Sequence, residues 1–272
     1  MKDSRWIWIM ALAVFALACA GMARMDAQPE TAEVFAVSQE ENLFAPPAQE
    51  DTFSIEVMDV QQLPRRRVLI YHTHTYEAFA QVEDAPYAET EKWRSADSRF
   101  NMVRVGAELA ALLRSMNVEV VHDTTAFEPP VLSTAYARSL EMLRARQAAG
   151  ETYDLWIDLH RDAYIEGQKG PNSVDLGGGK AARLMMLIGS GQGFDEKPDW
   201  EENLSIAQAI TAALNEQSEG LGRDVAVKTG RYNQHVARGC ILIEAGNNRN
   251  TLEEVLCAMP ALADAICQAL GV

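Results

Sequence analysis

The pattern of apolar and polar residues changes near residue 65 of this chain. Beyond that point, short apolar runs alternate with longer segments in which apolar residues recur at helical spacing. Each run has the usual length of a β-strand. The runs are Val68–His72, Val118–Val121, Leu155–Leu159, Leu184–Ile188, Val225–Lys228 and Cys240–Ala245. We therefore expect about six strands.

Apolar residues spaced by three and four predict amphipathic helices between these runs. The clearest stripe consists of Met102, Val105, Leu109, Leu112 and Met116, and shorter stripes lie at Tyr136–Leu143 and Leu204–Leu214. Strands that alternate with helices are typical of an α/β domain. We predict an open, mostly parallel or mixed sheet of about six strands, with helices on both faces, over residues 65–272.

Two helix-start signals lie near the C-terminus. Thr251 and Glu254 form a capping box, in which each side chain bonds the other residue's backbone N–H. Pro260 suits the first turn of a helix, where no backbone N–H is needed, and predicts that a further helix begins there. The chain is therefore expected to end in helices.

The first 23 residues have the layout of an export signal. An uncharged apolar run over residues 6–22 follows Lys2 and Arg5, as in a signal peptide or a short membrane anchor. We favour an uncleaved anchor that holds the rest of the chain outside the cytoplasm. Cleavage and secretion, or lipid attachment at Cys19, are the alternatives.

Residues 24–64 predict an acidic, disordered tether. From Asp26 to Asp59 there are nine acidic residues and no Lys or Arg, a pattern that is solvated and self-repelling. The whole chain carries a formal net charge of −15. Because a phosphate backbone would repel such a chain, nucleic acid is excluded as an expected partner.

Candidate chemistry lies where three of the predicted strands end. The first strand leads into His72 and His74, the third into His160, and the last into Glu244. Ligands of open α/β sheets bind at the carboxyl ends of the strands. Two histidines and a carboxylate are typical ligands of catalytic zinc, and a further carboxylate can take a proton from the attacking water. Structural roles for the same residues are equally compatible with this pattern.

Seven motifs occur in the order seen in a known family. They are VLIYHTHTYEAF at 68–79, FNMVRVGAEL at 100–109, YARSLEML at 136–143, IDLHRDA at 157–163, WEENL at 200–204, RYNQH at 231–235 and ILIEAGNNRNTLEEV at 241–255. From residue 67 onward the chain resembles the stage II sporulation protein P family of zinc-dependent N-acetylmuramoyl-L-alanine amidases. The resemblance implies a cell-wall amidase fold and a zinc cofactor.

The resemblance also assigns roles to residues. It implies that His74 and His160 bind zinc and that Glu244 is the catalytic acid and base. For the third ligand we rank Glu77 slightly above Asp97. Further residues in the motifs are interpreted as facing the substrate or supporting the metal site, namely His72, Arg161, Asp162, Asn233 and His235.

The implied reaction is hydrolysis of the amide between N-acetylmuramic acid and L-alanine in peptidoglycan, during engulfment in sporulation. Implied partners are a sporulation lytic transglycosylase and other engulfment membrane proteins. A zinc endopeptidase that cuts stem-peptide cross-links is one alternative. An inactive, amidase-like wall-binding scaffold is the other.

Overall fold

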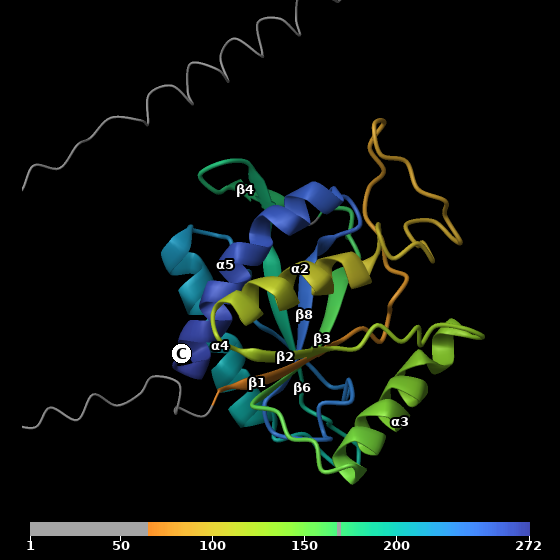
Figure 1. The fold of residues 1–272 in the computed structure, drawn as a ribbon, viewed down its shortest axis with the longest axis vertical. Coiled ribbons are helices and arrows are strands. Elements are labelled where there is room, and N and C mark those ends of the chain that lie inside the picture. The colour runs from red at the N-terminus through yellow and green to blue at the C-terminus, as the bar shows by residue number, and fades with distance from the viewer. Residues whose placement is uncertain (1–64, 168–169) are drawn as a thin grey trace, which may run out of the picture. The chain divides into compact units, whose positions relative to one another are not determined.

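The computed structural model describes residues 65–167 and 170–272 (Figure 1). The anchor expected at 1–23 and the tether expected at 24–64 lie outside these residues. Among the helices of the described ranges, none has the length and apolar character needed to cross a membrane.

The centre of the domain is a six-stranded mixed sheet in the order β2-β1-β3-β8-β6-β7. Its strands are β1 (Arg67–Tyr71), β2 (Glu119–His122), β3 (Leu155–Asp162), β6 (Leu184–Gly189), β7 (Ala226–Lys228) and β8 (Cys240–Asn247). Neighbouring strands are parallel except for β6 and β8, which pair antiparallel. All six predicted runs form strands, and the predicted fold class is confirmed.

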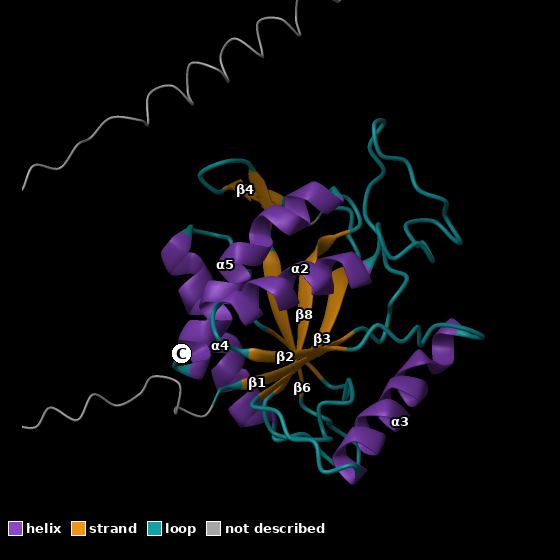
Figure 2. Cartoon of the chain, in the orientation of Figure 1, coloured by secondary structure: helices purple, strands orange, loops and turns teal. Residues whose placement is uncertain are grey.

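Helices cover both faces of the sheet. On one face, α2 (Met102–Ser115) and α4 (Trp200–Gln217) pack on the strands, and α5 (Leu252–Leu270) packs against both of these helices. On the other lies α3 (Ala135–Ala148), well separated from α2 and α5 in Figure 2. The faces alternate along β1, because Val68 and Ile70 belong to the larger core, whereas Leu69 and Tyr71 pack with Leu143 of α3.

The end of the chain differs from its prediction in one respect. Thr251 caps α5 and forms the expected capping box with Glu254. The prediction that a new helix begins at Pro260 is wrong, because Pro260 lies inside the continuous α5. Buried Met259, Leu262 and neighbouring residues bind the helix to the core on both sides of the proline, and this packing outweighs the one hydrogen bond that proline cannot make.

A short hairpin was not predicted. Its strands, β4 (Ser173–Asp175) and β5 (Lys180–Ala182), pair antiparallel outside the main sheet. Each strand has three residues, too few to show a period of two in the sequence. The hairpin contacts α5 and also β8.

Candidate active site

The candidate site lies where three neighbouring strands end. β1, β3 and β8 are adjacent and parallel, so their carboxyl ends meet at one edge of the sheet. In the register of β3 with β8, His160 stands opposite Glu244. Alternation from Trp156 and Cys240, which pack on the α3 side, directs both side chains to that same face.

Two histidines and one glutamate lie together here. His74 follows β1 in a turn closed by the Glu77 N–H, which donates to His74 O at 3.2 Å. The rings of His74 and His160 meet edge to face with centroids 5.2 Å apart. Glu77 Oε2 is 3.5 Å from His160 Nδ1. The structure therefore brings His74, Glu77 and His160 into one cluster.

Asp97, the other candidate for a third ligand, is engaged elsewhere. Its carboxylate accepts from the Arg99 guanidinium, with an Oδ2 to Nη2 distance of 2.6 Å, and from the Arg99 backbone N–H at 3.0 Å. The Asp97 side chain is partly exposed, whereas Glu77 is buried. Of the two carboxylates, the one in contact with His160 is Glu77.

His160 lies between two carboxylates. Its Nε2 is 2.8 Å from Asp158 Oδ1, and its Nδ1 faces Glu77. Burial alone would lower the pKa of His160, but Asp158 and Glu77 together raise it well above its usual value. Burial would likewise raise the pKa of Glu77, yet the interaction with His160 brings it to about 2. This part of the site therefore favours positive charge.

Glu244 has the opposite electrostatic character. Its Oε2 is buried and has no hydrogen-bond partner among the described residues. Burial, reinforced by the charges of Glu77 and Asp162, raises its pKa to about 8, although His160 acts in the other direction. A carboxyl with a pKa near neutrality can both accept and return a proton at physiological pH.

A chain of buried, hydrogen-bonded polar groups leads from Asp158, the partner of His160, to α3. Asp158 accepts from the Thr73 N–H at 2.8 Å and from its hydroxyl at 2.7 Å. The Thr73 hydroxyl contacts Ser139 of α3, which accepts from Asn233 Nδ2 at 3.0 Å. Asn233, one of the predicted site residues, therefore joins its loop to α3 and to the Asp158 carboxylate.

Two tyrosines that sequence reasoning did not select border the histidines. The Tyr136 ring lies 5.5 Å from the His74 ring and 6.1 Å from the Tyr232 ring, measured between centroids. Tyr136 was interpreted only as part of an apolar helical stripe. The sequence features that could have pointed to these tyrosines are the motifs that contain them, YARSLEML for Tyr136 and RYNQH for Tyr232.

A buried glutamate beside His74 was also missed. Glu128 Oε1 accepts from the Tyr76 N–H at 3.0 Å, pairs with Arg94 and lies 4.0 Å from His74 Nδ1. It belongs to the loop between β2 and α3, which has no periodic pattern. No signal in the sequence pointed to it.

His72 lies in the interior between β1 and α2. Its Nδ1–H donates to Leu159 O at 2.9 Å, so its Nε2 accepts from His122 Nε2 at 2.9 Å. Gly106 of α2 packs directly against both rings. The His72 side chain is fully buried, and in this structure it has no open face toward a substrate.

The other predicted residues have identifiable contacts. Arg161 is buried and donates to Ala78 O at 3.1 Å and to Trp93 O at 3.3 Å, while its backbone N–H donates to Glu77 Oε2 at 3.2 Å. It thereby holds the segment that carries Glu77. Asp162 pairs with Arg223 at 2.8 Å. His235 lies apart from this cluster, beside Glu196.

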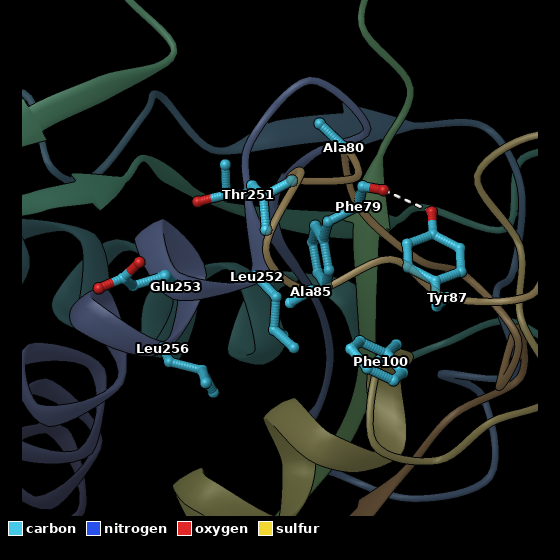
Figure 3. Close-up of a pocket in the computed structure, with 10 residues that line it drawn as sticks. Phe79, Ala80, Ala85, Tyr87, Phe100, Thr251, Leu252, Glu253 and Leu256 are labelled. Carbon is cyan, nitrogen blue, oxygen red and sulfur yellow. Dashed lines mark hydrogen bonds between the residues drawn. The ribbon is translucent and has the colours of Figure 1, made fainter. Parts of the chain in front are cut away.

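The apolar hollow in Figure 3 is a separate feature. It has a volume of about 230 Å³ and is bordered by Phe79, Tyr87, Phe100, Leu252 and Leu256. The Tyr87 hydroxyl donates to Phe79 O at 2.5 Å and closes one side. No predicted site residue in the described part of the chain lines this hollow, so it is not where the chemistry was expected.

Within residues 65–167 and 170–272, no three His, Cys, Asp or Glu side chains are grouped as a ready-made metal site. The donor types at the strand ends are nevertheless those that zinc prefers. Donors on one tetrahedral zinc, each about 2.0–2.1 Å from it, stand roughly 3.4 Å apart. Glu77 Oε2 and His160 Nδ1 are separated by 3.5 Å.

Two comparisons with known proteins indicate the same family. The family model described as stage II sporulation protein P matches residues 23–267. Stage II sporulation protein P of Bacillus subtilis (strain 168) is 26% identical over 211 residues, which are 74% of this chain and 50% of that protein. The chain therefore spans about half the length of this curated relative.

Solved structures with a related arrangement are distant in sequence. N-acetylmuramoyl-L-alanine amidase AmiC2 of Nostoc punctiforme is 12% identical, with a TM-score of 0.47 over 76% of this chain and 98% of that one. The CwlD amidase from Clostridioides difficile, solved with the GerS lipoprotein, is 11% identical, with a TM-score of 0.49 over 76% of this chain and 99% of that one.

Proposed function

We propose, because this chain belongs to the stage II sporulation protein P family, that it hydrolyses peptidoglycan at the amide between N-acetylmuramic acid and L-alanine. The observation that carries this proposal is the meeting of three strand ends. They bring His74, Glu77 and His160 together beside Glu244, whose Oε2 is buried and whose pKa is about 8. Such a set can activate water against an amide carbonyl.

Zinc is the cofactor that we propose for this site, held by His74, Glu77 and His160. The 3.5 Å between Glu77 Oε2 and His160 Nδ1 suits two ligands of one ion. The buried Nδ1 of His74 lacks a hydrogen-bond partner among the described residues, which leaves this ring nitrogen uncommitted. When bound, zinc polarises a carbonyl and lowers the pKa of water.

Glu244 is the group that moves the proton. In its ionised form it accepts a proton from the attacking water, and in its protonated form it returns that proton to the leaving amine. A pKa near neutrality makes both directions accessible. The absence of a hydrogen bond to Oε2 from the described residues leaves that oxygen available for the water.

Other residues orient the ligands. Asp158 contacts the far nitrogen of His160 and thereby fixes the ring and its protonation. Arg161 holds the Glu77 segment through backbone carbonyls. The Tyr136 ring meets the His74 ring edge to face and limits the access of bulk water to that side.

The setting that we propose is outside the cytoplasm, with the chain held to the membrane by residues 1–23 and acting in engulfment during sporulation. Peptidoglycan is the proposed substrate. A sporulation lytic transglycosylase and other engulfment membrane proteins are the proposed partners, on the strength of family membership.

The test is digestion of purified peptidoglycan with the full chain, loaded with zinc, followed by mass spectrometry of the products. Free stem peptides and unsubstituted glycan strands are expected. Cut cross-links with the sugar still attached would instead identify an endopeptidase. Bound zinc without any product would identify a wall-binding scaffold.

A further inference from the structure

Three basic side chains converge on one exposed carboxylate, Glu196. Glu196 Oε2 lies 3.2 Å from Arg144 Nη2, 3.6 Å from His235 Nε2 and 3.7 Å from Arg231 Nη1. Arg144 is on α3, Glu196 on the loop after β6, and the other two on the loop after β7. The four residues come from three segments that are far apart in the chain, and the fold brings them to one place.

His235 is unusual within this cluster. Its side chain is fully covered, yet neither ring nitrogen has a hydrogen-bond partner among the described residues. The 3.6 Å to Glu196 is too long for a hydrogen bond. Buried polar groups are normally satisfied, and leaving one unpaired costs stability. Glu196 therefore does not satisfy the hydrogen-bonding groups of His235.

The loop that carries Arg231 and His235 is held in a strained shape. Tyr232 and Asn233 have φ values of 47° and 55°, in the left-handed region that non-glycine residues rarely adopt. Asn233 Nδ2 donates to Tyr136 O at 2.8 Å, and Gln234 Nε2 donates to Leu187 O at 2.9 Å. Strain that the surroundings enforce in this way is common where a loop presents ligand-binding groups.

Two segments connect the cluster to the site where the amide would be cut: α3, which carries both Arg144 and Tyr136, and the loop after β7, which carries Arg231 and Tyr232. Tyr232 follows Arg231 directly, and its ring lies 6.1 Å from that of Tyr136, which in turn faces His74. Phe194 lies under the Arg231 guanidinium, 4.5 Å from the ring centroid. The ring thus helps to hold the guanidinium in place.

We propose that Arg144, Arg231 and His235 form a binding site for a free carboxylate of the peptidoglycan stem peptide, in which Glu196 takes the place of the substrate. The identity of the ligand rests on the function proposed above. Guanidinium groups bind carboxylates with two parallel hydrogen bonds, a geometry that lysine cannot offer. The Glu196 side chain is 57% exposed, and exposed ion pairs contribute little stability, so displacing it costs little.

The test measures binding rather than turnover. The full chain is titrated by calorimetry with a synthetic stem peptide that starts with L-alanine and γ-linked D-glutamate, prepared once with free carboxylates and once with all of them amidated. The free-acid peptide is expected to bind at least tenfold more tightly. Glu196→Gln should increase its affinity several-fold, and Arg231→Gln should abolish the preference over the amidated peptide.

Glu202→Gln is the matched control, since it removes one exposed negative charge that pairs with Arg238 and should leave the affinity unchanged. Equal affinity for the two peptides, binding of neither, or weaker binding by Glu196→Gln would overturn the proposal. The reaction is judged separately. If the chain digests peptidoglycan but binds both peptides equally, only the carboxylate subsite is refuted. If it prefers the free-acid peptide but digests no peptidoglycan, only the proposed reaction is refuted.

Discussion

His160 and Glu244 stand opposite one another in the parallel pairing of β3 with β8, and both project toward the face covered by α3. Their environments raise the pKa of both groups, for different reasons. Asp158 and Glu77 favour the charged form of His160, whereas burial favours the neutral form of Glu244. One register pair thus combines an imidazole held between two carboxylates with a carboxyl whose pKa is about 8.

Glu244→Gln is expected to abolish hydrolysis while leaving zinc in place. Glutamine keeps the shape of the side chain but cannot accept the proton, and loss of a general base typically costs about 10²–10⁴-fold in rate. The rate comes from release of stem peptides, and the zinc content from elemental analysis. His160→Ala, by comparison, should lose both properties. A Glu244→Gln protein that stays active would place the base elsewhere.

Glu77→Gln and Asp97→Asn are expected to differ in zinc content. Both changes remove one carboxylate charge, but only Glu77 contacts His160, whereas Asp97 is bound to Arg99. Glu77→Gln should therefore weaken zinc binding, measured by competition with a chelator, while Asp97→Asn should bind zinc as the unmodified chain does. The reverse result would make Asp97 the ligand and Glu77 a supporting group.

The central strands were predictable because they are buried on both faces. Val68, Leu69, Ile70 and Tyr71 are all covered, so β1 appears in the sequence as an unbroken apolar run. The strand-end positions of His74, His160 and Glu244 followed from the same runs. The helix cap at Thr251 was also predictable from the sequence, because a capping box lies within four consecutive residues.

The features that were not predicted depend on contacts between distant parts of the chain, which no local sequence pattern reveals. Glu128 reaches His74 from a loop 54 positions away in the sequence. Tyr136 sits in a helical stripe, and only the packing of α3 shows that its ring turns toward His74. The contact of Glu77, rather than Asp97, with His160 likewise depends on the fold of the segment between β1 and α2. Pro260 was misinterpreted because tertiary packing outweighed a local preference.

Gly106→Ala is expected to destabilise the domain. A Cβ at this position of α2 would lie 2.5 Å from His122 Nε2 and 2.6 Å from His72 Nε2, atoms that already hydrogen bond each other. Overpacking costs about 1–3 kcal/mol, and the higher helix propensity of alanine recovers about 1 kcal/mol. Denaturant unfolding should therefore show a loss of up to about 2 kcal/mol.

Gly178→Ala provides the comparison for that measurement, because a Cβ at Gly178 meets no atom within 4 Å in the described part of the chain. Its free energy of unfolding should match that of the unmodified chain within about 0.5 kcal/mol, as for surface substitutions generally. If Gly106→Ala is no less stable than Gly178→Ala, the two histidine rings have room to move apart and do not constrain α2.

Asp123→Asn is expected to lower stability at neutral pH and to matter less in acid. Burial would raise the pKa of Asp123, but Arg146 at 2.7 Å and Thr125 lower it below its usual value. A carboxyl with a depressed pKa stabilises the fold above the pKa of the unfolded chain, about 3.9, and this contribution disappears as the pH falls through the folded value. The loss at pH 7 should be about 1.5–3 kcal/mol, the usual range for a hydrogen bond to a charged group, and should shrink from pH 5 downward in urea unfolding.

Glu119→Gln is the control for this measurement, because it removes a half-exposed partner of Arg67. It should lower the free energy of unfolding by less than about 1 kcal/mol. Equal losses for the two variants would show that the Asp123 pair is no stronger than a surface contact.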